Sequence, residues 1–115
     1  MYGFLNTCIG RTFTGLVFTY LSGLLPVEKI RETNRIIAFY HPKPVYRTHI
    51  LLVPKHPVST LLDLNENDIE FLQDLYACVK SLVKELELEN RGYRVIVNGG
   101  KYQEFPHLHF HLIAE

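Results

Sequence analysis

The sequence predicts an α+β fold built on an antiparallel sheet. Two segments of strand-like composition, residues 35–40 and 48–53, precede a long segment of helical periodicity at residues 65–86. Two more strand-like segments, residues 93–97 and 105–114, follow it. The links between neighbouring strand-like segments are short, and such strands pair antiparallel because a parallel pair needs a long crossover. This order of elements predicts an antiparallel sheet with a helix packed against it.

The first two strands are predicted from β-branched and aromatic residues. These residue types dominate RIIAFY at 35–40 and THILLV at 48–53. Pro42 and Pro44 lie between the two segments, and prolines favour an extended connection over a helix. We therefore expect the two strands to form an antiparallel pair, preceded by a polar turn over residues 31–34.

The helix is expected to begin after Asn65. Asn65 is a favourable N-cap with Asp68 three residues later, and Glu66 adds negative charge at the positive end of the helix dipole. The Asn-Arg-Gly run at residues 90–92 is a stop signal. Between these signals, apolar residues recur every three or four positions and predict one buried stripe: Ile69, Leu72, Leu75, Tyr76, Val79, Leu82, Val83 and Leu86.

The last two strands are expected to be joined by a hairpin. The first of them is YRVIV at residues 93–97, and the dipeptide Asn98-Gly99 that follows tolerates positive φ. A reversal at this point sends the chain back along the preceding strand. The final strand is then expected over residues 105–114.

Residues 12–27 are uncharged and form the one stretch that suggests a membrane. The stretch is shorter than the about 20 apolar residues that span a bilayer, and it contains threonines, glycines and Pro26. The basic segment and cleavage site typical of a signal peptide are not evident. We therefore expect no membrane association, and a helix over residues 10–24 that packs on the domain or on a partner chain.

Length, composition and charge predict one domain over residues 1–115, with an apolar helical extension at 1–30 and a core at 35–114. The chain has 12 Lys and Arg against 12 Asp and Glu, so it lacks the basic excess that non-specific nucleic-acid binding requires. Nucleic acid is therefore excluded as the main partner. Cys8 and Cys78 form no C-x-x-C motif, which predicts free thiols and a cytoplasmic protein.

The run His-Leu-His-Phe-His-Leu-Ile at residues 107–113 carries the chemistry. In a strand, successive side chains point to opposite faces, so His107, His109 and His111 are expected on one face and apolar residues on the other. A solvated face does not need three imidazoles, because Thr, Lys or Glu would serve it as well. Two interpretations follow from these residues alone: a metal site, or a metal-free acid/base or nucleophilic site.

Both interpretations rest on imidazole chemistry. Neutral imidazoles from alternate strand positions can converge on Zn²⁺, and His41, His49 and Glu104 are candidates for further ligands. Without a metal, a neutral imidazole nitrogen is a nucleophile toward phosphorus, and neighbouring imidazoles orient it and stabilise phosphate charge. The spacing of the histidines does not distinguish the two.

Residues 107–113 resemble the H-φ-H-φ-H-φ-φ signature of the histidine triad family of nucleotide-binding proteins and hydrolases. Other segments agree with this likeness: Ala-Phe-Tyr at 38–40, His-Ile-Leu-Leu-Val-Pro-Lys at 49–55, the long helix, and Gly-Tyr-Arg-Val at 92–95 with the later Asn98. Together they resemble the family's succession of motifs from its first strand onward. The resemblance covers about two-thirds of the chain and is closest to the Hint-like branch.

The resemblance implies a five-stranded antiparallel sheet with two helices, in a homodimer that shares an extended sheet. It also implies a hydrolase or transferase that acts at the α-phosphate of a purine nucleotide or nucleotide conjugate. The reaction would proceed through a nucleotidyl-histidine intermediate and would need no metal or cofactor. The bond cleaved would be a phosphoramidate or a related bond.

The resemblance also assigns roles to residues by position. His109 matches the nucleophile, and His107 and His111 flank it. His49 matches a fourth histidine that approaches from the neighbouring strand. The positions implied to bind the nucleotide are Asn98, Gln103, His41 and Phe39.

Two residues depart from the Hint-like pattern. Glu104 stands where that branch commonly has a serine that hydrogen-bonds the leaving group, and a carboxylate there repels phosphate. His41 stands where the branch usually has an aspartate that binds the ribose hydroxyls. Two alternatives are therefore kept: a dinucleoside polyphosphate hydrolase of the Fhit-like branch, and a nucleotide-binding or scaffold protein whose turnover these two residues weaken.

Overall fold

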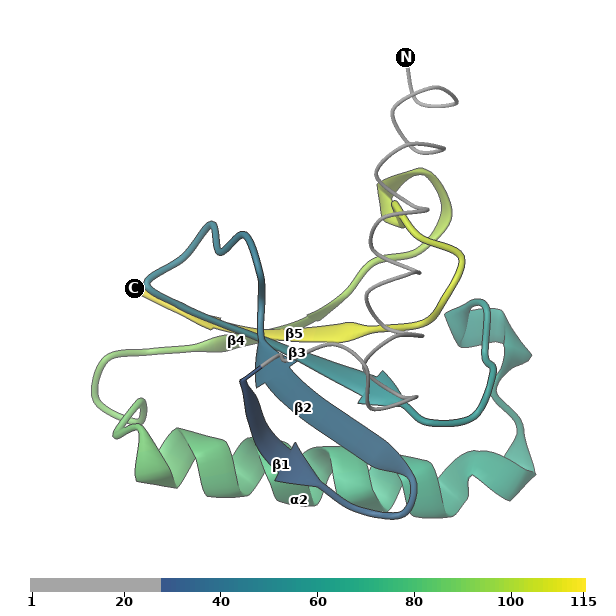
Figure 1. Cartoon of the computed structure of the whole chain (residues 1–115), viewed down its shortest axis with the longest axis horizontal. Coiled ribbons are helices and arrows are strands. Elements are labelled where there is room, and N and C mark those ends of the chain that lie inside the picture. The colour runs from purple at the N-terminus through teal and green to yellow at the C-terminus, as the bar shows by residue number, and fades with distance from the viewer. Residues whose placement is uncertain (1–27) are drawn as a thin grey trace.

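The computed structural model describes residues 28–115, in which one long helix lies against an antiparallel sheet (Figure 1). In chain order the elements are β1 (Lys29–Glu32), β2 (Ile36–Tyr40), β3 (Thr48–Pro54), η1 (Leu61–Asp63), η2 (Glu66–Asp68), α2 (Ile69–Glu85), β4 (Arg94–Val97), η3 (Gly100–Tyr102) and β5 (Phe110–Ala114). Here η denotes a short 3₁₀ helix. The predicted α+β class is confirmed.

The sheet has five strands in the order β1-β2-β3-β5-β4, and every neighbouring pair is antiparallel. The five-stranded antiparallel sheet is therefore confirmed. The expected pairing of β2 with β3 is also present, with Ile36 opposite Pro54 and Tyr40 opposite Ile50. β3 and β5 are neighbours inside the sheet, whereas β1 and β4 form its two edges.

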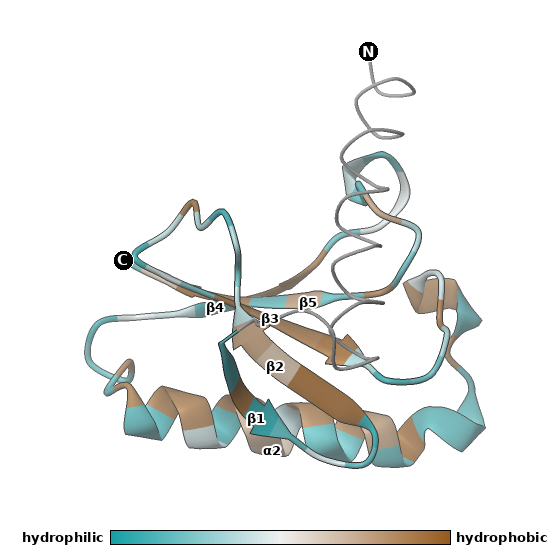
Figure 2. Cartoon of the chain, in the orientation of Figure 1, coloured by the Kyte–Doolittle hydropathy of each residue, from teal (hydrophilic) through white to brown (hydrophobic). Residues whose placement is uncertain are grey.

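The main hydrophobic core lies between α2 and one face of the sheet. Figure 2 shows β2 as a largely hydrophobic strand and β1 beside it as a largely hydrophilic one. Alternate residues of the inner strands meet the buried side of α2 because successive side chains of a strand point to opposite faces. The buried members from these elements are Ile36, Ala38, Ile50, Leu52, Phe110, Leu112 and Ala114 of the sheet, and Phe71, Leu75, Cys78, Val79, Leu82 and Val83 of the helix.

The start of the helical region has the predicted cap. The side chain of Asn65 accepts a hydrogen bond from the backbone N–H of Asn67 at 2.8 Å. The carboxylate of Asp68 accepts one from the backbone N–H of Asn65 at 3.0 Å. This reciprocal pair satisfies N–H groups that a helix leaves without partners. η2 starts here and α2 continues from Ile69.

The buried stripe of α2 differs from the predicted one at its borders. Phe71 and Cys78 are buried although the prediction omitted them, while Ile69 is 55% exposed and Tyr76 is 66% exposed. The sheet covers the side of the helix that carries Leu75. Phe71 lies one turn before Leu75 on that side, whereas Ile69 and Tyr76 lie at its margin. Periodicity alone therefore located the helix but displaced part of its buried face.

Strand β1 was not predicted, because residues 31–34 were expected to form a polar turn. The strand ends at Glu32 and the turn follows it. Arg31 donates hydrogen bonds to the hydroxyl of Ser81 and to the carboxylate of Glu85, both at 2.8 Å. Polar contacts with α2 thus hold this edge strand, and a search for apolar residues does not detect them.

The final strand is shorter than predicted. It was expected over residues 105–114, but β5 begins at Phe110. Pro106 has no N–H group and cannot donate to a strand ladder. Leu108 instead donates its N–H to the carbonyl of Val58 at 2.7 Å. His107 and His109 therefore lie just before β5.

The predicted antiparallel pairing of the last two strands is confirmed, but the connection between them is longer than expected. Residues 98–109 form a longer loop that includes η3, and Gly100 has φ of 57°, in the left-handed region. The loop rises from the sheet face opposite α2 (Figure 1). A positive φ is indeed used near this position, but at Gly100 and within a loop rather than in a two-residue turn.

A second cluster of buried hydrophobic residues lies apart from the main core. It comprises Ile37, Phe39, Leu51, Val53 and Phe105. Its strand members alternate with residues of the main core, so they belong to the sheet face that points away from α2. The histidines of β3 and β5 share this face.

No helix within residues 28–115 combines the length and hydropathy needed to cross a membrane. The helix expected over residues 10–24 and the uncharged stretch at 12–27 lie outside the described residues. The second helix of the predicted fold falls in the same region.

Candidate active site

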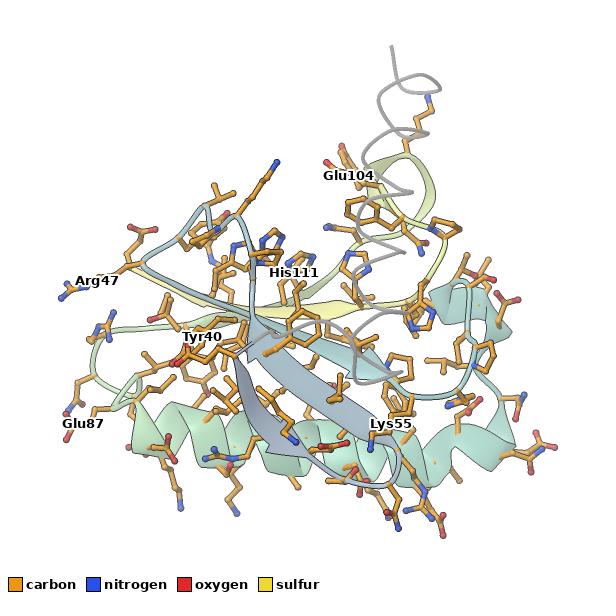
Figure 3. All side chains as sticks on the ribbon, viewed as in Figure 1. Tyr40, Arg47, Lys55, Glu87, Glu104 and His111 are labelled. Atoms are coloured by element: carbon orange, nitrogen blue, oxygen red, sulfur yellow. The ribbon has the colours of Figure 1, made fainter. Side chains whose placement is uncertain are left out.

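A cluster of imidazoles lies on the sheet face away from α2 (Figure 3). β3 supplies His49, β5 supplies His111, and the segment before β5 supplies His109. The alternation predicted for residues 107–113 is confirmed here, because Leu108, Phe110 and Leu112 belong to the core beneath α2. His41 follows β2 at the edge of the cluster. Ring centroids are 4.4 Å apart for His41 and His49, 5.2 Å for His49 and His111, and 5.0 Å for His109 and His111.

The tautomer of His109 is fixed by its neighbour. Nδ1 of His109 lies 2.8 Å from the backbone carbonyl of His107. A carbonyl only accepts hydrogen bonds, so Nδ1 carries the proton. In the neutral ring the lone pair is then on Nε2. His109 is only 6% exposed, which removes most of the water that would solvate this lone pair.

A chain of three hydrogen-bonding groups fixes the tautomer of His111. The backbone N–H of Val45 donates to Nδ1 of His49 at 3.1 Å, so the neutral ring of His49 has its proton on Nε2. That Nε2 lies 2.9 Å from Nδ1 of His111. His111 therefore accepts at Nδ1 and carries its own proton on Nε2.

Nε2 of His111 is buried and has no hydrogen-bond partner within residues 28–115. A buried donor without a partner costs about 1–3 kcal/mol, so folded proteins seldom retain one without use. The rings of His109 and His111 are neighbours, with centroids 5.0 Å apart and an edge-to-face orientation. A nitrogen lone pair and an unsatisfied N–H donor thus occur side by side.

Burial keeps these rings neutral. Desolvation is the largest cause that lowers the pKa of His109 and of His49. Desolvation and the positive charge that neighbouring histidines would carry lower the pKa of His111 to about 3. The same causes lower the pKa of His41 to about 4. The rings are therefore available at neutral pH as hydrogen-bonding groups and as a nucleophile.

His107 contributes mainly through its backbone. Its carbonyl holds His109, while its own Nε2 lies 3.3 Å from the carbonyl of Pro54. Burial lowers the pKa of this ring as well. Ring contacts in the described part of the chain join the other cluster histidines but not His107. The structure thus brings four of the five histidine rings predicted at the site into one contact chain.

Apart from His41, the loop after β2 was not predicted to take part in the site. His41 accepts a hydrogen bond at Nδ1 from the backbone N–H of Lys43 at 2.9 Å. The backbone N–H of Val45 donates a hydrogen bond to His49. The rings of Tyr46 and His49 pack in a T-shaped arrangement with centroids 5.4 Å apart. Residue types do not reveal which backbone N–H groups donate hydrogen bonds. Only the prolines of this loop could have suggested that its conformation is fixed.

The remaining predicted site residues have different surroundings. Phe39 is buried in the second hydrophobic cluster. Gln103 is buried, and its amide nitrogen donates to the carbonyls of Ser59 and Phe105 at 2.7 and 2.9 Å. Asn98 is partly buried directly after β4. Gln103 thus holds the loop in place with its amide nitrogen.

Two residues of the 98–109 loop adjoin His109. The ring of Phe105 lies 5.8 Å from that of His109. The charge of Glu104 favours the protonated form of His109 and opposes part of the pKa lowering. No group of three or more His, Cys, Asp or Glu side chains within residues 28–115 is arranged to hold a metal ion.

The comparisons with known proteins agree with this geometry. A family profile described as "HIT domain", the histidine triad domain, matches residues 23–115. The chain belongs to the HIT family. A HIT-like protein of Buchnera aphidicola is 34% identical over 97 residues, which cover 82% of this chain and 86% of that protein. The adenosine 5'-monophosphoramidase of Candida albicans is 34% identical over 103 residues, covering 83% of this chain and 66% of that protein.

Solved structures of HIT proteins share the fold. A histidine triad protein from Clostridium difficile superposes with a TM-score of 0.76 at 32% identity, over 84% of this chain and 86% of that one. A HIT family hydrolase from Legionella pneumophila gives 0.75 at 33% identity, over 83% and 87%. The resemblance stated from the sequence is thus confirmed, and the general class of the protein is that of a HIT hydrolase.

Proposed function

We propose that this HIT protein hydrolyses a phosphoramidate or related bond at the α-phosphate of a purine nucleotide, with His109 as the nucleophile. The observation that carries the proposal is that two neighbouring rings, with centroids 5.0 Å apart, supply the Nε2 lone pair of His109 and an N–H of His111 that has no partner within residues 28–115. The lone pair of His109 can attack phosphorus. The N–H of His111 can donate to the phosphate oxygens that gain charge in the transition state.

The first step transfers the nucleotidyl group to the protein. The lone pair on Nε2 of His109 forms a bond to phosphorus, and the P–N bond to the leaving group breaks. Its electron pair stays on the leaving nitrogen, which takes a proton from solvent and departs as an amine. The N–H of His111 donates to a phosphate oxygen during this step, while the carbonyl of His107 stabilises the growing charge on the His109 ring.

The second step releases the nucleotide. A water oxygen attacks phosphorus, and the bond between phosphorus and Nε2 breaks with its electron pair returning to Nε2. The proton of the water passes to solvent and the product is a nucleoside monophosphate. The protein groups in both steps are side-chain and backbone atoms of this chain, and the proposed reaction uses no metal and no cofactor.

Relatives support the choice of leaving group. The homologous proteins of Candida albicans and Saccharomyces cerevisiae are both named adenosine 5'-monophosphoramidases, and the second is 37% identical over 93 residues. We extend that activity to this chain as part of the proposal. Asn98, His41 and Phe39 would contact the nucleotide, and Gln103 would shape the loop beside it.

The proposal includes a homodimer formed through β4. This strand pairs only with β5 and has an open edge within the described sheet. Val95 on the strand is 38% exposed, and Tyr76 and Tyr93 beside it are 66% and 46% exposed. Tyr76 and Tyr93 line a groove between α2 and the segment that precedes β4. A second copy of the chain could pair with the open edge and cover the aromatic residues.

Mass spectrometry of the intact protein tests the reaction. The protein is mixed briefly with an adenosine phosphoramidate at mildly acidic pH, where the leaving nitrogen is protonated more readily. We expect a transient adduct of nucleotide mass that His109→Ala abolishes. His56→Gln is the matched control, because His56 bonds to Asp68 at 2.8 Å and is not part of the ring cluster. It should retain the adduct.

Two results would contradict the nucleophile assignment. An adduct that survives in His109→Ala would place the covalent bond elsewhere. Nucleotide binding without adduct or product, measured by calorimetry on the same samples, would favour the nucleotide-binding or scaffold alternative.

A further inference from the structure

The backbone around Glu104 is held beside the nucleophile by its two neighbours. Gln103 before it is buried and donates to the carbonyls of Ser59 and Phe105. Phe105 after it is also buried and packs 5.8 Å from the ring of His109. Glu104 itself is exposed. Its position is therefore fixed by anchored neighbours, while its own side chain faces solvent.

The carboxylate of Glu104 is not neutralised by another residue within 28–115. It makes no hydrogen bond and no ion pair with any side chain or backbone group in the described range 28–115. Its negative charge nevertheless acts on His109, where it raises the pKa of the ring and opposes part of the lowering by burial. Figure 3 shows Glu104 on the same side of the sheet as His111. A negative charge on an anchored stretch of backbone thus lies at the solvent side of the imidazole cluster.

The leaving group must depart on the side where Glu104 lies. His109 is 6% exposed and forms the floor of the site. In displacement at phosphorus, the attacking and leaving atoms lie roughly in line on opposite sides of the phosphorus atom. An attack from the buried floor therefore drives the leaving group outward, toward solvent and the exposed Glu104.

We propose that Glu104 makes the site select leaving groups that carry a positive charge and reject those that carry a negative one. The inference rests on the proposed function, since it concerns the leaving group of that reaction. The preferred class is a nucleotide phosphoramidate whose amine bears a second, cationic group, such as an ammonium or guanidinium at the end of a short alkyl chain.

The expected size of the effect follows from the exposure of Glu104. An ion pair at a solvent-exposed site changes an equilibrium by about two- to fivefold, and repulsion of a like charge has a similar size. The preference between a cationic and an anionic leaving group should then be about 4- to 25-fold at low ionic strength. Salt should reduce it, because exposed charges are screened.

Three adenosine phosphoramidates of equal chain length test the proposal. Their leaving amines end in an ammonium, a methyl or a carboxylate group. The measured quantity is kcat/KM for each substrate, and the readout is the ratio of the ammonium to the carboxylate substrate. This ratio does not depend on the overall activity of a variant. Glu104→Gln should bring it close to one, and Glu104→Lys should invert it.

Glu87→Gln is the matched control, because it removes the same charge from an exposed position in the turn region after α2. It should keep the ratio of the unsubstituted protein. Equal ratios in the unsubstituted protein and in Glu104→Gln, with turnover retained, would overturn this inference and leave the proposed function standing. Absence of turnover and of the histidine adduct with all three substrates would overturn the proposed function, and this inference with it.

Discussion

Nε2 of His49 lies 2.9 Å from Nδ1 of His111, across the paired strands β3 and β5. The N–H of Val45 fixes the other nitrogen of His49 as an acceptor. His49 therefore donates from Nε2 to Nδ1 of His111, and the proton of the His111 ring is on Nε2. A backbone group in a loop thus determines which nitrogen of a neighbouring strand's histidine can donate to a substrate.

Substitution of His49 should impair the reaction through the tautomer of His111. In His49→Leu, Nδ1 of His111 loses its donor, and the proton of His111 is free to move to Nδ1. We expect kcat to fall by about 10- to 100-fold, corresponding to the loss of about 1.4–2.7 kcal/mol of transition-state stabilisation. Steady-state kinetics with an adenosine phosphoramidate measure the change.

His49→Gln is the control for this prediction. The amide nitrogen of glutamine can occupy the place of Nε2 and donate to His111, so it should recover part of the lost kcat. Nitrogen chemical shifts of the His111 ring would report its tautomer directly. Equal losses in the Leu and Gln variants, with the ring tautomer unchanged, would contradict the argument.

Stability should fall as the pH drops below about 6.5. His41, His49, His107, His109 and His111 all have a pKa lowered by burial in the folded chain, His41 to about 4 and His111 to about 3. In the unfolded chain each returns to about 6.5. Between these values the unfolded state binds more protons, so acidification favours it.

Urea denaturation between pH 7.5 and pH 5 measures this dependence. The midpoint should decrease steadily as the pH falls below 6.5. The variant His41→Asn removes one of the titrating rings and should show a shallower decrease. A midpoint that stays constant or rises from pH 6.5 to pH 5 would contradict the lowered pKa values.

The imidazole face could be predicted because it depends on alternation. Leu108, Phe110 and Leu112 lie beneath α2 and His111 lies on the other face, as a period of two requires. The pairing of His49 with His111 could not be predicted from spacing, because it depends on which strands are neighbours. The chain passes through α2 and the edge strand β4 before β5 returns beside β3. Only the family resemblance anticipated that juxtaposition.

The parts that sequence reasoning missed are those held by polar or backbone contacts. β1 lacks an apolar pattern and is fixed by Arg31 through Ser81 and Glu85. The extent of β5 was overestimated because Pro106 interrupts the ladder and Leu108 bonds to Val58 instead. The N–H of Val45 orients His49 whatever side chain that residue carries. Such contacts follow from three-dimensional arrangement rather than from residue type.

The corrected buried face of α2 predicts a large difference between two nearby residues. Phe71 is 1% exposed in the core, whereas Ile69 is 55% exposed. Phe71→Ala should lower the free energy of unfolding by about 3–5 kcal/mol, because it leaves a cavity. Ile69→Ala should change it by less than about 1 kcal/mol. A loss for Ile69→Ala equal to that for Phe71→Ala, measured by urea denaturation, would contradict the observed difference in burial.

The proposed homodimer predicts that a charge on β4 separates the protomers. Val95→Lys places an ammonium group at the open edge of the strand, where like charges from the two copies would meet. Sedimentation equilibrium should show twice the 13.4 kDa chain mass for the unsubstituted protein and the chain mass for the variant. Val45→Lys introduces the same residue at a 76% exposed loop position and should stay dimeric. A monomeric unsubstituted protein would rule out this part of the proposal.

Gln103 should control both stability and the charge preference assigned to Glu104. Its amide nitrogen donates to two carbonyls, those of Ser59 and Phe105, and connects the loop before β5 to the segment after β3. Gln103→Glu keeps the shape but removes both donors and sets a carboxylate against two carbonyl oxygens. The free energy of unfolding should fall by about 1–3 kcal/mol. Gln103→Met, which also loses the donors but adds no charge, should lose less.

The same two variants separate positioning from charge. In Gln103→Met the loop is less firmly held, so the kcat/KM ratio between cationic and anionic leaving groups should shrink although Glu104 is still present. In the double variant Gln103→Met with Glu104→Gln the ratio should not shrink beyond that of Glu104→Gln alone, because both changes act through one carboxylate. A further decrease in the double variant would show that Gln103 influences the leaving group independently of Glu104.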